Sequence, residues 1–214
     1  MNILHYFGRA TIRIDTTDGR SIYIDPYAEG DYSKPADLVL VSHGHGDHNA
    51  IQKVTLKPDG LVIAAPEALA DGLVPLEQFH LISEGGRVEQ AGISVQAVPA
   101  YNKNHDRRTT IGFILRFEGL CIYHASDTSY IPEMAALATE HIDYALLPTD
   151  GHYNMDGDEA RRCADIIKPR FAIAIHSSPN GNWDAVRAAK LSGPDVIALA
   201  PGEKLELLCY KNAN

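Results

Sequence analysis

The sequence predicts an α+β fold in which two mixed β-sheets pack against each other with helices outside, as a single domain over residues 1–214. In the first half, short β-rich segments follow one another with glycine-containing turns between them. In the second half, helical and strand patterns alternate. No repeat, low-complexity tract or linker divides the chain, which is long enough for one substantial core.

The first half contains a series of expected strands. Asp18-Gly19 is a hairpin signal between two of them. Residues 38–42 (LVLVS) form a continuous apolar run, which is typical of a strand buried on both faces. Residues 61–65 repeat that pattern, and Pro66 then predicts a short helix over 66–71. The remaining strands are expected at 3–7, 11–15, 21–25, 87–89, 93–99, 111–117 and 120–124.

The second half is expected to alternate helix and strand. Asp156 and Glu159 form a capping-box pattern at the start of a helix over 156–168, and Pro169 ends it. Ala160 and Cys163 begin the apolar face of this helix. The other helices are expected at 131–139 and 183–191, and the strands at 144–147, 171–175, 196–198 and 205–209.

Composition narrows the classes of function. The chain has 19 Lys and Arg against 28 Asp and Glu, and its formal charge of −9 does not favour nucleic acid as a partner. No apolar run is long enough to span a membrane, and the first ten residues lack a signal-peptide pattern, so we expect a soluble cytoplasmic protein. Cys121, Cys163 and Cys209 lie in apolar patterns, which predicts small buried side chains in a reducing compartment.

The most informative segment follows the buried strand 38–42. Residues 43–48 have the sequence HGHGDH, so three of the ten histidines and one aspartate fall within six positions. The two glycines let the backbone turn sharply. His43 and His45 can then face one ion, while Asp47 and His48 turn towards a second. Imidazole and carboxylate together suit zinc, and also iron or manganese.

Four ligands cannot complete two coordination spheres, so we expect further ligands at the ends of other strands. Asp127 follows the strand 120–124, where a carboxylate could bridge two cations, although it could instead cap the next helix. His176 ends the apolar strand 171–175, a place that a structural histidine also occupies in many proteins. His105, in the loop after 93–99, is the third candidate, but other histidines compete with it.

With these residues the sequence resembles the metallo-β-lactamase superfamily, whose hallmark His-x-His-x-Asp-His is present at 43–48. The later histidine, aspartate and histidine also come in the family's order. More narrowly, the chain is similar to a small metal-dependent hydrolase branch that includes L-ascorbate 6-phosphate lactonase-like proteins. That similarity rests on IDP at 24–26, VPAYN at 98–102 and YHASDT at 123–128, where Ser126 stands in place of the usual glycine.

The resemblance implies a four-layer αββα sandwich with the metals at one edge of the β-sandwich. It also implies two divalent ions, with zinc preferred over manganese or iron. The ligands for one ion would be His43, His45 and His105, those for the other Asp47, His48 and His176, and Asp127 would bridge the two.

Three further residues are candidates for orienting ligands or contacting substrate. Asp25 ends a strand beside the expected site and could orient a histidine, although it is equally suited to a turn before Pro26. His152 could bind substrate or donate a proton, or could be a plain loop histidine. Tyr101 could donate a hydrogen bond to substrate, although packing is the commoner role for a tyrosine. His5 and His124 could also lie near the metals, and His124 is better explained as a satisfied buried histidine.

The predicted activity is hydrolysis of a small-molecule substrate by a hydroxide that two metal ions activate, with Asp47 and Asp127 positioning the water and accepting its proton. Branch resemblance favours a lactone or other small ester, with a phosphodiester second. The rival class is a non-catalytic metal-binding or sensor protein on the same fold. The sequence leaves a homo-oligomer open.

Overall fold

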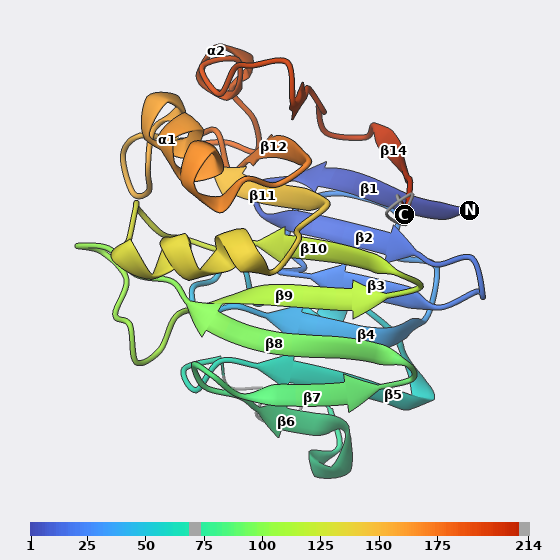
Figure 1. Cartoon of the computed structure of the whole chain (residues 1–214). Helices are drawn as coiled ribbons and strands as arrows, with labels where there is room; N and C mark the ends of the chain where they lie inside the picture. Colours follow the sequence, from blue (N-terminus) through green and yellow to red (C-terminus); the bar gives the residue numbers. More distant parts are fainter. Residues whose placement is uncertain (69–73, 210–214) are drawn as a thin grey trace.

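The structure, a computed structural model, describes residues 1–68 and 74–209. It consists of two seven-stranded sheets packed face to face (Figure 1). The order is β14-β1-β2-β3-β4-β5-β6 in the first sheet and β13-β12-β11-β10-β9-β8-β7 in the second. The predicted α+β sandwich of two mixed sheets is therefore confirmed.

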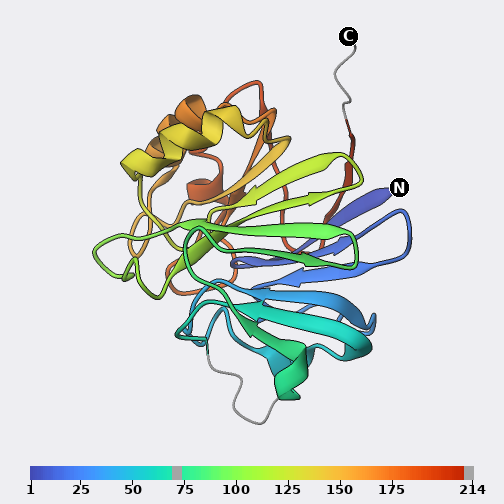
Figure 2. The ribbon, with the colours of Figure 1, turned by 60° about the horizontal axis from the view of Figure 1, so that its bottom comes forward.

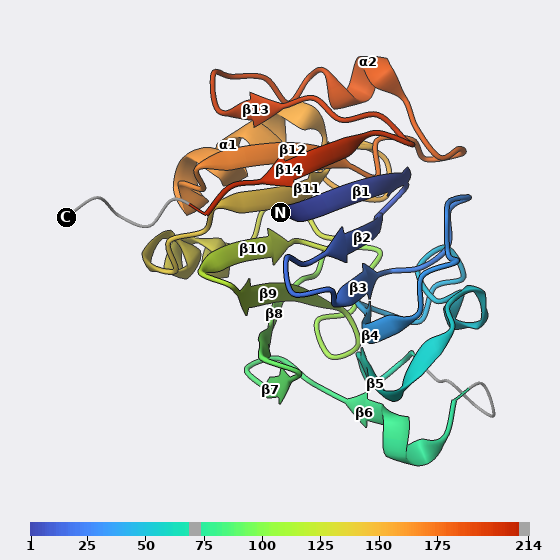
Figure 3. The ribbon, with the colours of Figure 1, turned by 90° about the vertical axis from the view of Figure 1, so that its right-hand side faces the viewer.

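The first sheet changes from antiparallel to parallel pairing at β3. The pairs from β14 to β3 are antiparallel, and those from β3 to β6 are parallel (Figure 3). Parallel pairing brings the carboxyl ends of β3, β4 and β5 to the same edge of the sheet, where the HGHGDH loop begins. The strands are β1 (Asn2–Gly8), β2 (Thr11–Asp15), β3 (Ser21–Ile24), β4 (Ala36–Val41), β5 (Leu56–Ala64), β6 (Phe79–Leu81) and β14 (Lys204–Leu207).

The second sheet repeats this change of pairing. Strands β7 to β10 pair antiparallel, and β10 to β13 pair parallel. Tight hairpins join β7 to β8 at 91–92 and β9 to β10 at 118–119, and the hairpin predicted at Asp18-Gly19 is confirmed by the antiparallel β2–β3 pair. The strands are β7 (Arg87–Gln90), β8 (Ile93–Pro99), β9 (Ile111–Phe117), β10 (Leu120–His124), β11 (Tyr144–Pro148), β12 (Phe171–Ile175) and β13 (Val196–Ile197).

The main core lies between the two sheets. Ile12 and Leu38 of the first sheet and Phe113 and Ile122 of the second are fully buried there. All six residues of β4 are buried, as the apolar run predicted, because its other face is covered as well. This burial makes the end of β4 a rigid base for the loop that follows.

Most of the helical structure covers the outer face of the second sheet. Helix α1 (Gly157–Ile167) and the 3-10 helix η3 (Pro132–Thr139) lie side by side there (Figures 1 and 2). The short helix α2 (Ala185–Ala188) packs beside them. On the first sheet, the described outer cover consists of loop residues and the 3-10 helix η1 (Ile51–Lys53), and η2 (Leu76–Gln78) precedes β6.

Several predicted boundaries were wrong. The helix expected at 183–191 shortens to α2, because the Asp184 side chain accepts the amides of Val186 and Arg187 and so begins the helix there. Trp183 packs instead against Tyr6, with ring centroids 5.7 Å apart. The helix predicted over 131–139 is present, as a 3-10 helix over 132–139.

The remaining differences concern short segments near β5, β6 and β14. Residues 66–68 form a turn, and the rest of the helix expected over 66–71 lies outside the described residues. Strand β6 was not predicted, and β14 runs over 204–207 rather than 205–209. Cys121 and Cys163 are buried as expected, but Cys209 lies beyond the end of β14 and is exposed. Among the described residues, no helix is long and apolar enough to cross a membrane.

Candidate metal centre

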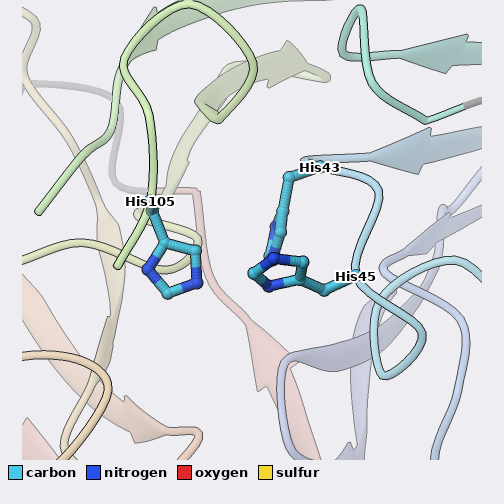
Figure 4. Close-up of side chains that lie close together, drawn as sticks. All are labelled: His43, His45 and His105. Atoms are coloured by element: carbon cyan, nitrogen blue, oxygen red, sulfur yellow. The ribbon is translucent and has the colours of Figure 1, made fainter. Parts of the chain in front are cut away.

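Three histidines from the two sheets converge at one edge of the sandwich. His43 and His45 leave the end of β4, and His105 reaches them from the loop between β8 and β9 (Figure 4). The ring centroids of His43 and His45 lie 4.6 Å apart, and each lies 5.1 Å from that of His105. One nitrogen from each ring lies within 4.8 Å of the others, a spacing that could hold one cation.

A second group lies beside the first. Asp47, His48 and His176 each offer an atom within 4.8 Å of the others. The Asp47 Oδ2 atom lies 3.5 Å from His176 Nε2, and Asp47 Oδ1 lies 3.9 Å from His48 Nε2. His176 follows β12, so this group also joins the two sheets.

Asp127 lies between the two groups. Its Oδ1 atom is 3.5 Å from His48 Nε2, and its Oδ2 atom is 3.3 Å from His105 Nε2 and 3.7 Å from His176 Nε2. The carboxylate does not cap the following helix, because η3 begins after Ile131 and has no side-chain cap. The Asp127 carboxylate therefore lies close to both groups.

The donor atoms fit cations because several of them are buried without another partner. The Nε2 atoms of His43, His48 and His176 and the Oδ1 atom of Asp127 have no hydrogen-bond partner among the described residues. Buried polar atoms are nearly always paired in proteins. Four such atoms facing one region therefore favour a bound positive charge there.

Asp25 holds His48 in the orientation that this fit requires. Asp25 is fully buried and accepts the Ser42 amide at 2.8 Å and the Ser42 hydroxyl at 2.7 Å. Its Oδ2 atom also lies 2.8 Å from His48 Nδ1, which leaves the other ring nitrogen facing the site. Asp25 has the left-handed backbone angle φ of 47°, so it turns the chain after β3 while it orients the ligand. The two roles that its sequence suggested occur together.

His105 has a comparable partner, and a carboxylate lies close to His176. Asp150 Oδ2 lies 3.2 Å from His176 Nδ1, and Asn154 donates to the same oxygen. The Asn102 side-chain oxygen lies 3.0 Å from His105 Nδ1. The sequence carries no signal for either partner, because Asp150 and His176 follow different strands and Asn102 reaches His105 only through the fold of the loop that they share.

The acidic and histidine side chains of the centre shift one another's pKa values. Burial opposes ionisation of Asp127, but nearby His176 and His48 hold the pKa of its carboxyl well below the usual range. Burial also opposes charge on His48, yet Asp127 and Asp25 raise its pKa well above that of an ordinary histidine. For His43, burial dominates and lowers the pKa to about 3, so its ring stays neutral and able to coordinate.

Four other predicted candidates contribute no atom to the clustered donor groups. His152 is exposed, and its ring packs on Tyr153. Tyr101 donates its hydroxyl to Glu133 at 3.0 Å, in a neighbouring pocket that His152 also lines. His124 Nε2 donates to the Ala10 carbonyl at 3.0 Å, which agrees with a satisfied buried histidine, and His5 pairs with Asp15 at 3.0 Å.

A cleft of about 440 Å³ opens onto the centre. Arg9 lies at its wall, with Nη1 3.2 Å from Asp47 Oδ2. The sequence gave Arg9 no role, because a lone arginine after Gly8 carries no signal of a site. The described lining residues are Arg9, His45, Asp47, Asn104, His105, Asp127, Tyr153, His176 and Pro179.

Known proteins are similar to this chain in sequence and in fold. A family model described as a β-lactamase superfamily domain matches residues 3–176. A UPF0173 metal-dependent hydrolase of Pyrococcus abyssi is 33% identical, with 94% of this chain and 98% of that protein covered. A relative of the same description from Thermococcus onnurineus is also 33% identical, with 95% and 99% covered.

Solved structures agree. A crystal structure assigned to a metal-dependent hydrolase of Parabacteroides distasonis has a TM-score of 0.75 and 33% identity, and covers 91% of each chain. The structure of Igni18, a metallo hydrolase of Ignicoccus hospitalis, has a TM-score of 0.73 and 24% identity over 97% of this chain and 99% of that one, which shows a shared fold. The chain belongs to the metallo-β-lactamase superfamily and is a metal-dependent hydrolase.

Proposed function

We propose that this chain hydrolyses a small ester, with a lactone as the first candidate, at a centre that holds two divalent metal ions. The observation that carries the proposal is the position of Asp127, whose two oxygens face ligand groups on either side. A single-ion site would not need both groups.

Each residue has a distinct role in the proposal. His43, His45 and His105 would hold one ion, Asp47, His48 and His176 the other, and Asp127 both. When bound, the two ions would lower the pKa of a shared water from 15.7 to about 7 and polarise the scissile group. Asp127 and Asp47 would position that water and accept its proton, and Asp25 and Asp150 would keep the histidines in place. The mixed nitrogen and oxygen donors favour zinc, and also suit manganese or iron.

The cleft supports catalysis rather than metal storage or sensing. It reaches Asp127 and His176 from the surface, so a substrate group can approach both expected ions. The lactone or small ester is favoured by the resemblance to lactonase-like proteins, and a phosphodiester is the second candidate. The net charge of −9 gives no support to a nucleic-acid substrate.

The test combines metal analysis with a substrate panel. Elemental analysis of purified protein should give two ions per chain, and lactones should be hydrolysed faster than phosphodiesters. A His45→Ala/Asp47→Ala variant should lose metal and activity together. Hydrolysis that persists in that variant after metal removal would refute the proposal.

A further inference from the structure

We infer that Arg9 is a specificity residue that binds an anionic group, a carboxylate or a phosphate, on the substrate. The inference deepens the proposed function and rests on it. It follows from how the backbone of Arg9 is fixed, how its guanidinium is partnered, and the charge that surrounds it.

The backbone of Arg9 is fixed to the metal centre. Its carbonyl accepts the amide of His176 at 2.7 Å and the Tyr6 hydroxyl at 3.0 Å. Its own amide donates to the Asn182 carbonyl at 2.9 Å. Arg9 has a φ of 51° and His176 a φ of 42°, so the two residues that share this backbone hydrogen bond are both in the left-handed region. Such conformations persist where the surroundings enforce them, often at functional sites. The guanidinium is therefore delivered to the cleft from a rigid base.

The guanidinium of Arg9 is the only arginine or lysine head group among the described residues that line the cleft. Its Nη1 atom faces Asp47 and donates to the Ser178 carbonyl at 3.4 Å. Its Nε atom is buried with no hydrogen-bond partner among the described residues. A guanidinium has five N–H donors in a planar fork that matches a carboxylate or a phosphate. The contacts in the structure leave part of that fork unused.

The partner of Arg9 distinguishes it from other arginines of the chain. Arg13, Arg116 and Arg161 pair with carboxylates that have no place in the expected ligand set. Arg9 instead shares Asp47 with the centre. An ion bound to Asp47 would withdraw part of the negative charge that Arg9 faces, and an anion from the substrate could replace it.

The charge balance of the loaded site points the same way. Asp47 and Asp127 in the expected ligand set, with Asp25 and Asp150 behind the histidines, would balance the charge of two divalent ions, so Arg9 supplies the positive charge that remains. In a chain with a net charge of −9, this concentrates attraction for anions at one cleft. Because Arg9 lies 3.2 Å from an expected ligand, the anionic group should lie close to the scissile carbonyl.

The test uses three activated esters and a variant without the charge. The probes are the 4-nitrophenyl ester of acetic acid, the monoester of succinic acid, and the 4-nitrophenyl ester of phosphonoacetic acid. In Arg9→Gln protein loaded with zinc, kcat/KM should fall at least tenfold for one or both charged esters and stay within threefold for the acetate. The charged ester that loses more identifies the carboxylate or the phosphate as the recognised group.

Two controls separate recognition from structure. Arg20→Gln removes the same charge at the β2–β3 turn, where Arg20 pairs with Asp18, and should change none of the three rates. Zinc content, measured by elemental analysis, should be equal in wild type and Arg9→Gln. If zinc content falls, or all three esters slow equally, Arg9 only positions Asp47 and the inference is wrong.

A binding measurement keeps the inference testable apart from the reaction. Calorimetry should show that free succinate or free phosphonoacetate binds zinc-loaded wild type at least tenfold more tightly than zinc-loaded Arg9→Gln. Equal affinities for both anions would overturn the inference. If no ester is hydrolysed but this difference is present, the proposed ester hydrolysis fails while the anion site stands.

Discussion

Both carboxylate oxygens of Asp25 accept hydrogen bonds from neighbouring residues, and neither belongs to the clustered donor groups. Three N–H or O–H groups point at it, from the Ser42 amide, the Ser42 hydroxyl and His48 Nδ1. An asparagine has only one acceptor oxygen, so at least one of these donors would face an NH₂ group. Asp25 therefore holds the His48 ring in one orientation, with Nδ1 towards its carboxylate, and its value to the site lies in that orientation.

Asp25→Asn should weaken zinc binding by about 10- to 100-fold, because loss of a partner that orients a ligand costs that much in comparable sites. A competition titration with a chromophoric chelator measures it. Asp37→Asn is the matched control, since Asp37 is also buried and accepts the Ser21 amide and the Lys57 ammonium, but at the opposite end of β4. Equal losses in both variants would contradict the role of Asp25.

A comparison of His105 with His152 tests which histidines bind metal. His105 faces Asp127 at 3.3 Å, whereas His152 is exposed beside Tyr153. His105→Ala should bind fewer zinc ions per chain than wild type, and His152→Ala should bind as many. Elemental analysis after dialysis distinguishes them, and a full complement of zinc in His105→Ala would exclude His105 as a ligand.

The pH dependence of the metal-free protein follows from His176. Burial opposes its charge, but Asp127, Asp150 and Asp47 together raise its pKa to about 9. The unfolded pKa of histidine is about 6.5, so the extra stability is fully present below that value and is lost as pH rises towards 9. Urea unfolding of metal-free protein should therefore show a falling midpoint between pH 6.5 and 9. His176→Gln should have a flatter profile over that range, and identical profiles would contradict this assignment.

At the scale of elements, the residues of the candidate site lie at or just after the ends of strands. The ends of β3, β4, β10 and β12 supply Asp25, the HGHGDH loop, Asp127 and His176. These positions were predictable, because apolar runs that stop at a polar residue mark where a buried strand leaves the sheet. The boundary that failed at α2 depends on Asp184, which caps that helix, and on Trp183, which packs against Tyr6.

Helix α1 gives a test of element stability. Its Asp156 side chain accepts the Glu159 amide at 2.9 Å, as the capping-box pattern predicted. Asp156→Ala should lower the free energy of unfolding by about 1 kcal/mol, the usual cost of losing such a cap. Asp158→Ala removes a charge from the same first turn without removing the cap and should cost less. Chemical denaturation compares the two, and equal costs would contradict the capping role.

At the scale of the whole molecule, the expected ligands tie the two sheets together. The loop after β4 belongs to the first sheet, and His105, Asp127 and His176 follow strands of the second. Bound metal should therefore stabilise the packed sandwich as a unit. At a free zinc concentration 1,000 times the Kd, linkage predicts about 4 kcal/mol for one site. Scanning calorimetry with zinc and with chelator measures the shift, which His45→Ala/Asp47→Ala should lack.

The sequence could identify which residues end strands, but not which of them meet across the sandwich. The HGHGDH loop, Asp127 and His176 were predictable because each follows an apolar strand. The contacts of Asp150 and Arg9 were not, because they join loops from different strands, and the contact of Asn102 depends on how the loop after β8 folds. His152 and Tyr101 show the converse, since both follow strands as predicted, yet they line a neighbouring pocket.

The division of the expected ligands between two sheets would also order events during synthesis. Residues 43–48 leave the ribosome well before Asp127 and His176, so a nascent chain carries only part of the donor set. Tight metal binding then waits until β12 has joined the second sheet and the two sheets have docked. Retention of metal would thereby indicate that the sandwich has assembled correctly. A chain whose two sheets fail to pack together would lose its ions to a competing chelator.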